Sequence, residues 1–486
     1  MDKQASAKHR FLKNMIGFSM VTWISFVLGF IASPIATRLF PTEEMGRLNL
    51  FSSYGALFTS ICYLGLDQAF VRFFRERPGQ TSAKGLLGFC MGVPVAFSLL
   101  SSLALSFFWR SVSAEIVGAP DLTTFLCLCF YSFSWVVYRF LSLCYRMEQN
   151  ALMYTIQGVL HALLTKIAYL AVGFANPTGR AALIMLTLLM GVFTVVFIWV
   201  QRKRFDIREL KTVNGTSARE LCRYALPLAP YSLLSWANSQ TSALVLKHLM
   251  GYSATGIYSS ALGLASTINI IQTGFNAYWA PYVLENYKND EKARFYTVHR
   301  LMACLLTFFG LGITLLQSPV FLLLGRDYRS SVVFFPFLFL SPICYCLGET
   351  TGMGITIAKK TYWTTVIYLI SAALNIGLCF VFIPAMGMAG AAVASAASAI
   401  ITLLLRTKIG ETYYKALESW RYLGYTIGLM LTASIGNLLL TGAAKYALIL
   451  AVIALACWLF RRELNTLWTT ALQLLRSLMR KKEAQV

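Results

Sequence analysis

The chain has 486 residues, of which 57% are hydrophobic and 13% charged, and its mean hydropathy is +0.63. Soluble domains carry roughly 25% charged residues, so this composition excludes an ordinary soluble protein. The net charge of +22 would fit a nucleic-acid-binding protein, but the Lys and Arg residues gather at the ends of apolar segments, which argues against that class.

Apolar segments long enough to cross a hydrocarbon layer of roughly 30 Å recur along the whole sequence. They predict an all-α polytopic membrane protein with about fourteen transmembrane helices. The predicted spans are residues 14–38, 46–71, 85–109, 122–145, 151–174, 181–201, 224–247, 253–282, 297–323, 331–356, 362–383, 386–405, 422–441 and 445–460. The apolar run after the basic start MDKQASAKHRFLKN is too long for a signal-peptide core, so we expect a cytoplasmic tail there.

The distribution of basic residues predicts the orientation of these spans. With the N-terminus inside, 33 Lys and Arg residues fall on the cytoplasmic side and eight on the other side, while Lys166 belongs to neither. Because loops rich in Lys and Arg stay in the cytoplasm, both termini are predicted to be cytoplasmic. The positive charge then serves topology and attraction to anionic membrane lipid, and nucleic acid is not an expected partner.

The connections between spans are too short to hold an enzyme domain. The sequence contains no GxxxxGK[ST], HExxH or GxSxG motif, so nucleotide hydrolysis and hydrolase chemistry have no support. We therefore expect a protein that is not an enzyme and has no cofactor. The eleven cysteines lack a CxxC pair and are interpreted as small hydrophobic residues within helices.

An internal repeat relates the two halves of the chain. The connection RLFPTEEMG after the first span matches KHLMGYSATG about 210 residues later, so that Gly46 corresponds to Gly256. A parallel repeat of this kind implies two similar halves around a central cavity. The predicted organisation is a six-helix half (1–201), a cytoplasmic linker (202–223), a second six-helix half (224–405), and a last part (406–486) with a loop, two additional helices and a basic tail.

Several motifs together resemble one membrane-protein family. They are RLFPTEEMG (38–46), YLGLDQAFVRFF (63–74), YALPLAPYSLLSW (224–236), TGIYSSALGLAS (255–266), FNAYWAPY (275–282), LLLGRDYRSS (322–331) and LNIGLCFVFIPAMGMAGAAVASAAS (374–398). In order and spacing the chain resembles the oligosaccharide and polysaccharide flippases of the multidrug/oligosaccharidyl-lipid/polysaccharide exporter superfamily. It departs from them at Thr241-Ser242, where many relatives carry an acidic–basic pair, so a coupling role is not transferred to span seven.

The resemblance implies a V-shaped fold like that of the multidrug and toxin extrusion transporters, opening alternately to each side. It implies a flippase in the bacterial cytoplasmic (inner) membrane that moves polyprenyl-pyrophosphate-linked oligosaccharide to the outer leaflet for surface polysaccharide synthesis. Polysaccharide assembly proteins are then expected partners. The identity of the glycan stays open.

Basic residues within or beside the spans are the candidates for binding an anionic head group. Lys166 lies deep in span five, at the edge of a polar stripe formed by Tyr154, Gln157, His161, Thr165 and Tyr169 that is expected to face the cavity. Lys166 either contacts the pyrophosphate or glycan, or forms an ion pair with Asp67 or Glu349. His161 either contributes to the site or is a satisfied helix residue.

Three arginines complete the substrate-binding hypothesis. Arg139 near the inner end of span four and Arg72 after span two could meet the incoming head group, or act as ordinary positive anchors. Arg38 and Lys247 lie at equivalent outer ends in the two halves. We expect Arg38 to face the cavity and Lys247 to reach the membrane surface.

Two acids are candidates for coupling or gating by H⁺ or Na⁺. Asp67 either pairs locally with Arg72 or forms a gate. Glu349 is the only buried acid of the second half and is the better candidate for ion coupling. Two other functions remain open. One is a multidrug/cation antiporter of the related type, which usually has twelve spans and an acidic site; the other is a membrane glycan polymerase or ligase, which needs a large external loop.

Overall fold

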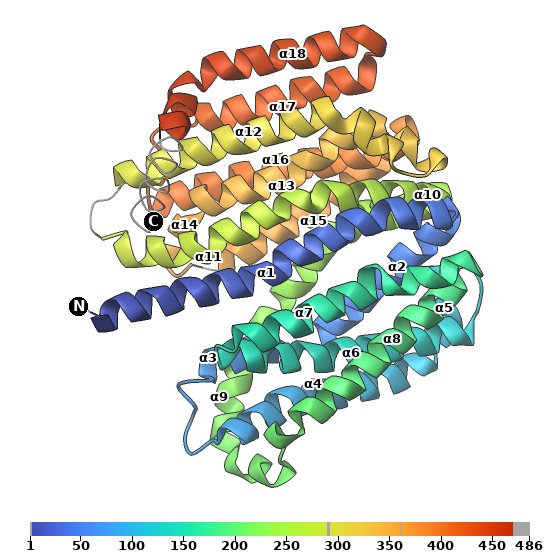
Figure 1. Cartoon of the computed structure of the whole chain (residues 1–486), viewed down its shortest axis with the longest axis vertical. Coiled ribbons are helices and arrows are strands. Elements are labelled where there is room, and N and C mark those ends of the chain that lie inside the picture. The colour runs from blue at the N-terminus through green and yellow to red at the C-terminus, as the bar shows by residue number, and fades with distance from the viewer. Residues whose placement is uncertain (1, 289–291, 361, 470–486) are drawn as a thin grey trace, which may run out of the picture. The chain divides into compact units, whose positions relative to one another are not determined.

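The computed structural model describes residues 2–288, 292–360 and 362–469, and every regular element in these ranges is a helix (Figure 1). The predicted all-α class is therefore confirmed. By length and hydropathy, ten helices in the described ranges could cross a membrane, or eleven if the bent pair η6 (Arg326–Val333) and α13 (Phe335–Thr351) is one span. These account for eleven of the predicted spans.

The other three predicted spans fall on helices that do not reach this threshold. Residues 46–71 form α2 and α3, while 224–247 and 253–282 fall on α10 and α11, all of which are interrupted or rich in polar residues. Gly65, with φ 73°, separates α2 from α3, and Gly251, with φ 85°, breaks α10 between the two predicted spans. Only glycine adopts these backbone angles readily. The total of fourteen spans stays a prediction.

The chain divides into two compact units. The first comprises Met1–Ser260 and Leu324–Tyr328, and so contains most of α10 (Ala229–Ala265). Its other elements are α1 (Asp2–Leu39), α2 (Thr42–Cys62), α3 (Leu66–Phe73), α4 (Ala83–Ser106), α5 (Trp109–Val117), α6 (Leu122–Met147), α7 (Ala151–Lys166), η1 (Ala168–Phe174), α8 (Gly179–Gln201), η2 (Arg202–Arg204), η3 (Ile207–Thr212), α9 (Gly215–Ala225) and η4 (Leu226–Leu228). The predicted halves and linker divide the chain differently and stay a prediction.

Polar side chains cap the first turns of α6, α7 and α8 in the first unit. Asp121 caps α6 by accepting from the backbone N–H groups of Thr123 and Thr124, and Thr178 caps α8. Asn150 caps α7 in the same way. Each cap satisfies backbone donors that the first helical turn leaves unpaired. These caps explain why the predicted starts at 122, 151 and 181 agree with the observed ones to within two residues.

The second unit comprises Ala261–Leu323 and Arg329–Val486. Its elements are η5 (Ser266–Ile268), α11 (Asn269–Asn286), α12 (Lys292–Leu322), α14 (Met353–Ile357), α15 (Tyr362–Met386), α16 (Met388–Tyr413), α17 (Arg421–Leu439) and α18 (Gly442–Leu459), together with α13 and most of η6. Helix α16 packs against both α13 and α15. Its alanines 391, 392, 394 and 396 are buried, because small side chains allow helices to approach closely.

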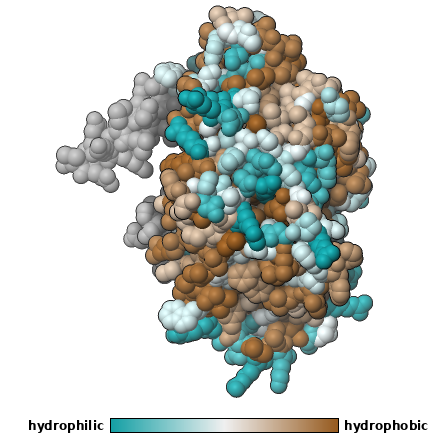
Figure 2. All heavy atoms as spheres, turned by 90° about the vertical axis from the view of Figure 1, so that its right-hand side faces the viewer, coloured by the Kyte–Doolittle hydropathy of each residue, from teal (hydrophilic) through white to brown (hydrophobic). Residues whose placement is uncertain are grey.

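Large apolar side chains cover much of the surface, as Figure 2 shows for one face. On α4, Leu99, Leu100 and Leu103 are each more than half exposed, and on α8 Val192 and Val195 are as well. A protein surrounded by water seldom exposes so many apolar residues together. This surface fits helices that are surrounded by lipid.

Candidate functional site

An ion pair within the first unit joins two of the predicted site residues. The Asp67 carboxylate lies in the first turn of α3, just after the left-handed Gly65, and Arg139 lies on α6. The Arg139 Nη2 and Nε atoms lie 2.9 and 3.1 Å from Asp67 Oδ2, which also accepts from Gln68. Among the seven predicted site residues that the structure describes, only these two contact each other.

The two members of this pair differ in exposure. The Asp67 side chain is 8% exposed, whereas that of Arg139 is 38% exposed. A guanidinium has five N–H donors in a fixed fork, which suits carboxylate and phosphate oxygens alike. Arg139 is thus held on one side by a buried acid and retains donors for a second anion on its exposed side.

The predicted local pair of Asp67 with Arg72 is wrong. Arg72 instead pairs with Glu76 at 2.6 Å, and both side chains are exposed. Residues four apart lie on the same face of a helix, whereas residues five apart point in directions about 140° apart. The Glu76 carboxylate raises the pKa of Arg72 through a side-chain hydrogen bond and its charge, so this arginine stays charged.

A second ion pair lies within the second unit. Glu349 on α13 accepts from Arg406 Nη1 on α16 at 3.0 Å, and the two side chains are 22% and 16% exposed. Arg406 was placed in a loop by the prediction that the twelfth span ends at 405, but α16 continues to Tyr413. The sequence signal for this pair is that Arg406 directly follows the apolar run ending at 405, so that one more helical turn would bring it into the span.

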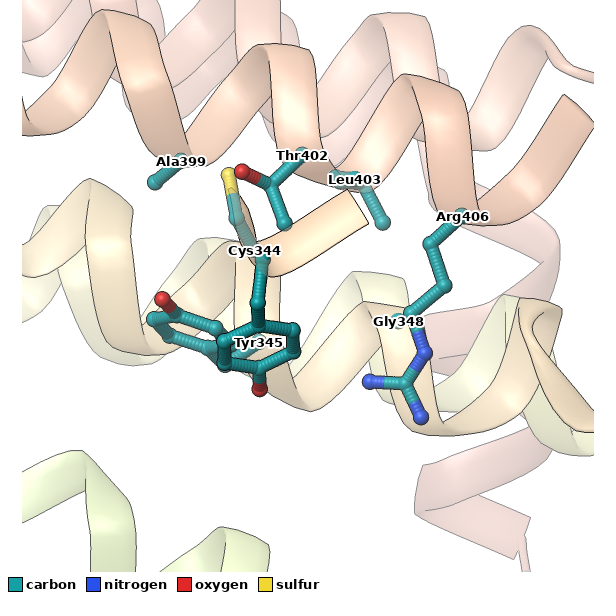
Figure 3. Close-up of a pocket in the computed structure, with 8 residues that line it drawn as sticks. Cys344, Tyr345, Gly348, Ala399, Thr402, Leu403 and Arg406 are labelled. Atoms are coloured by element: carbon teal, nitrogen blue, oxygen red, sulfur yellow. The ribbon is translucent and has the colours of Figure 1, made fainter. Parts of the chain in front are cut away.

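Two glycines allow the Arg406 side chain to pack directly against the backbone of α13 and the residue that follows it. A Cβ atom on Gly352 would lie 2.4 Å from Arg406 Nε, and one on Gly348 would lie 3.3 Å from Nη1. Figure 3 shows the guanidinium beside Gly348 at the edge of a small cavity. That cavity measures about 10 Å³, which is room for about one water molecule and no more. Arg406 is therefore enclosed by packing.

The sequence spacing of the repeat relates one residue of each ion pair, whereas their partners Asp67 and Arg406 are 339 residues apart. Arg139 and Glu349 are 210 residues apart, the same separation as Gly46 and Gly256. Arg139 and Glu349 carry opposite charges, and each is paired within its own compact unit.

Lys166 does not form the predicted ion pair with Asp67 or Glu349, since both acids pair with arginines. Its Nζ donates to the backbone carbonyl of Ser25 on α1 at 2.6 Å. A Cβ atom on Gly29 would lie 2.9 Å from Nζ, so this glycine makes room for the ammonium group. Lys166 ends α7, and its contact with α1 ties the two helices together.

The polar stripe of α7 does not face a cavity at Gln157 and His161, so that expectation is wrong for these two residues. Gln157 is fully buried, and the His161 ring is 7% exposed. The imidazole stacks on Tyr138 of α6 with ring centroids 4.0 Å apart and meets Trp135 at 4.6 Å. The polar stripe did not indicate a cavity, because aromatic side chains of α6 pack on the imidazole ring of His161 as they would on an apolar ring.

The repeated glycines Gly46 and Gly256 meet in a reciprocal contact within the first unit. A Cβ atom on Gly46 would lie 2.0 Å from the Tyr252 carbonyl oxygen, and one on Gly256 would lie 2.0 Å from the Thr42 carbonyl oxygen. Thr42 and Ser253 share a hydrogen bond of 2.7 Å across the same interface. Each glycine contacts a carbonyl four residues before the other glycine, so α2 and α10 cross here along their backbones.

A cluster around Glu115 extends this contact to α5. Lys247 and His248 of α10 lie 2.8 and 3.1 Å from Glu115 Oε1, and Tyr54 of α2 donates to the same atom at 3.0 Å. Burial raises the pKa of the Glu115 carboxyl, but the hydrogen bonds from Lys247 and Tyr54 outweigh it, and the pKa lies below its ordinary value. The expectation that Lys247 extends to the membrane surface is wrong, because its side chain is 10% exposed and paired. Arg38 at the equivalent place is exposed.

Comparison with known protein families identifies the family of this chain. A family model described as "Polysaccharide biosynthesis protein" matches residues 11–287, which is more than half of the chain. The chain belongs to this family. A comparison with curated protein sequences gave no match.

Solved structures show that the fold of this family member is shared with membrane transporters. It matches the "Lipid II flippase MurJ, inward closed conformation" with a TM-score of 0.67 at 15% identity, covering 92% of this chain and 99% of that one. It matches an inward-facing multidrug resistance MATE family transporter with a TM-score of 0.59 at 12% identity, over 82% and 97% of the two chains. The MATE multidrug transporter DinF-BH gives 0.60 at 15% identity, over 83% and 96%. At these identities the likeness establishes the fold.

Proposed function

We propose that this chain is a flippase that moves a polyprenyl-pyrophosphate-linked oligosaccharide from the inner to the outer leaflet of the bacterial cytoplasmic membrane by alternating access. The observation that carries the proposal is the membership of a polysaccharide biosynthesis family together with a fold that matches a lipid flippase over 92% of the chain. Polysaccharide synthesis builds on lipid carriers, and a chain of many apolar helices without an enzyme motif suits their transport.

Arg139 is our proposed contact for the pyrophosphate. Its guanidinium is the exposed member of the Asp67 pair, and a pyrophosphate carries more negative charge and more oxygen acceptors than one carboxylate. The cargo would exchange with Asp67 for part of the fork, so that Arg139 stays neutralised with and without cargo. The secondary candidates are Lys166, Arg38, Arg72 and His161. Of these, Lys166, Arg72 and His161 already have partners within the first unit.

We propose Asp67 as the coupling residue, with H⁺ or Na⁺ as the ion, and Glu349, which the sequence favoured, becomes the alternative. Each carboxylate holds an arginine, so binding of an ion by either acid requires that arginine to move. Asp67 is the better candidate, because the exposed Arg139 can move toward cargo whereas Arg406 is enclosed by Gly348 and Gly352. Cargo binding and ion binding would then both depend on movement of the Arg139 guanidinium away from Asp67.

The contact between Gly46 and Gly256 and the Glu115 cluster would form the closed side of the transporter. Both lie at connections that the charge distribution assigns to the outside. Direct backbone approach of two helices leaves no passage between them, and the ion pair of Glu115 with Lys247 reinforces the contact. Release of a glycan to the outside would require α2 and α10 to separate here.

A multidrug antiporter is the second candidate, because MATE transporters share the fold. Cationic drugs need an acid that is exposed to the solvent or cavity. In both ion pairs the acid is buried or half-buried, and in the first pair the exposed group is the arginine. The geometry therefore favours an anionic cargo.

The experiment is translocation in proteoliposomes of the full-length protein. A fluorescent polyprenyl-pyrophosphate oligosaccharide is followed by its accessibility to an impermeant quencher, beside the same lipid with an uncharged head group and beside efflux of a cationic dye. We expect translocation of the pyrophosphate lipid alone. Dye efflux without lipid translocation would establish the antiporter instead.

A further inference from the structure

A short basic segment, residues 202–212, begins at the end of a candidate membrane span. The apolar helix that includes α8 and η2 ends at Arg204, so the residues that follow begin at the end of a span. We call residues 202–212 the interfacial segment. It contains η3, whose six residues run directly alongside the start of another span, α4.

Glycines of α4 receive this segment. A Cβ atom on Gly85 would lie 2.5 Å from the Glu209 carbonyl oxygen, and one on Gly88 would lie 3.0 Å from the Leu210 side chain. The Ser82 backbone N–H, at the cap of α4, donates to Thr212 Oγ1 at 3.1 Å. The interfacial segment is therefore fixed against the ends of α4 and α8, at the level where a bilayer has its head groups.

The side chains of the interfacial segment combine positive charge with an exposed apolar residue. It holds five basic and two acidic residues, and Arg202, Lys203, Arg208 and Lys211 are exposed. One acid, Asp206, accepts from the Arg208 backbone N–H at 3.1 Å. Ile207 is 84% exposed, the largest exposed fraction among the apolar side chains described, and Leu210 is 38% exposed. An apolar side chain so exposed between basic residues suits the boundary between head groups and acyl chains.

We propose that the interfacial segment is a binding site for anionic phospholipid head groups, with Ile207 inserted at the acyl boundary and Lys203, Arg208 and Lys211 contacting phosphate. The inference does not depend on the cargo of the transporter. Lys and Arg residues near an anionic leaflet are attracted to it, and the net positive charge of the segment favours lipid anions over zwitterionic lipid. The site would fix the linker between the two predicted halves to one membrane leaflet.

The test uses the full-length protein in vesicles of phosphatidylcholine with spin-labelled phosphatidylglycerol or phosphatidylcholine. The triple variant Lys203→Gln, Arg208→Gln, Lys211→Gln is compared with a control that removes the same charge elsewhere, Lys359→Gln, Lys360→Gln, Lys408→Gln; these three lysines are also exposed. We expect the preference for phosphatidylglycerol to fall about three-fold or more in the first variant and by much less in the control.

Two further variants keep the proposal open to contradiction if the triple variant folds poorly. Lys203→Arg with Lys211→Arg preserves charge and should retain the preference. Ile207→Trp adds one indole to the ten native tryptophans. Lipids brominated in their acyl chains should quench the fluorescence that this variant gains over the wild type. An unchanged preference in the Gln variant, or no quenching at position 207, would overturn the lipid site, and binding of an acidic protein lost in the same variant would assign the surface to a protein partner instead.

Discussion

The two ion pairs of this protein, Asp67–Arg139 and Glu349–Arg406, use the same chemistry under different constraints. In the first unit the acid is buried and the arginine is 38% exposed, whereas in the second unit both side chains are at most 22% exposed. Gly348 and Gly352 enclose Arg406, and the cavity beside it holds about one water molecule. This difference is the basis of our proposal that Arg139 exchanges its partner, whereas Arg406 packs between α13 and α16.

The largest effect is expected from Arg139→Ala. Loss of the guanidinium leaves the Asp67 carboxyl buried and without its ion-pair partner, which typically costs about 3–5 kcal/mol of folding free energy. Thermal unfolding in detergent measures the loss. Adding Asp67→Asn should recover most of it, and a double variant as unstable as the single one would contradict a role for the pair in stability.

A smaller loss is expected from Gly352→Ala, which tests the enclosure of Arg406. The new Cβ atom would lie 2.4 Å from Nε and 2.7 Å from Cγ of Arg406, so the side chain must shift, at about 1–3 kcal/mol. Gly377→Ala in α15 is the matched control, because nothing lies within 4 Å of its Cβ position. Equal unfolding temperatures for the two variants would remove the packing argument.

Lys166→Met tests a third basic residue, one that donates to a backbone carbonyl instead of forming an ion pair. The loss of one charged hydrogen bond to Ser25 predicts a destabilisation of about 1.5–3 kcal/mol at most, and Lys166→Arg should recover only part of it because Gly29 leaves little space. Translocation per folded protein should change little. A loss of translocation at unchanged stability would move the cargo contact from Arg139 to Lys166.

The smallest effect concerns the pH dependence of the Glu115–Lys247 pair. The pKa of Glu115 lies below its ordinary value in the folded protein, so its contribution is complete above the unfolded value of about 4.3 and is lost as pH falls through the folded value. His248 also lies beside Glu115 and a histidine changes its charge between pH 5 and 8, so the comparison is made in a His248→Gln background. In that background, unfolding temperatures with and without Glu115→Gln should differ by a constant amount between pH 5 and 8 and approach each other as pH falls below about 4.3. Convergence already at pH 6 would show that the pKa is raised instead.

Much of the fold follows from sequence because its signals are local. Apolar length predicts the spans, and the structure shows that caps such as Asp121 and Asn150 begin helices close to the predicted starts. The repeat was visible as Gly46 and Gly256, and the structure supplies the reason, a backbone contact that excludes any side chain.

The candidate site was harder to predict because partners lie far apart in sequence. Asp67 and Arg139 are 72 residues apart, and Glu349 and Arg406 are 57 apart. Helical periodicity shows which residues share a face but not which helix covers it, so it placed Gln157 and His161 toward a cavity when α6 covers the histidine.

The most direct test of the central claim compares translocation of the polyprenyl-pyrophosphate oligosaccharide by two charge-neutral double variants in the same proteoliposomes. Asp67→Asn with Arg139→Gln removes the exchangeable pair, and Glu349→Gln with Arg406→Gln removes the enclosed one. Per folded protein, we expect the first to lose at least about ten-fold in rate, equivalent to about 1.4 kcal/mol, and the second to stay within about two-fold of the wild type. The reverse order, or equal rates in both variants, would contradict Arg139 as the contact for the anionic head group.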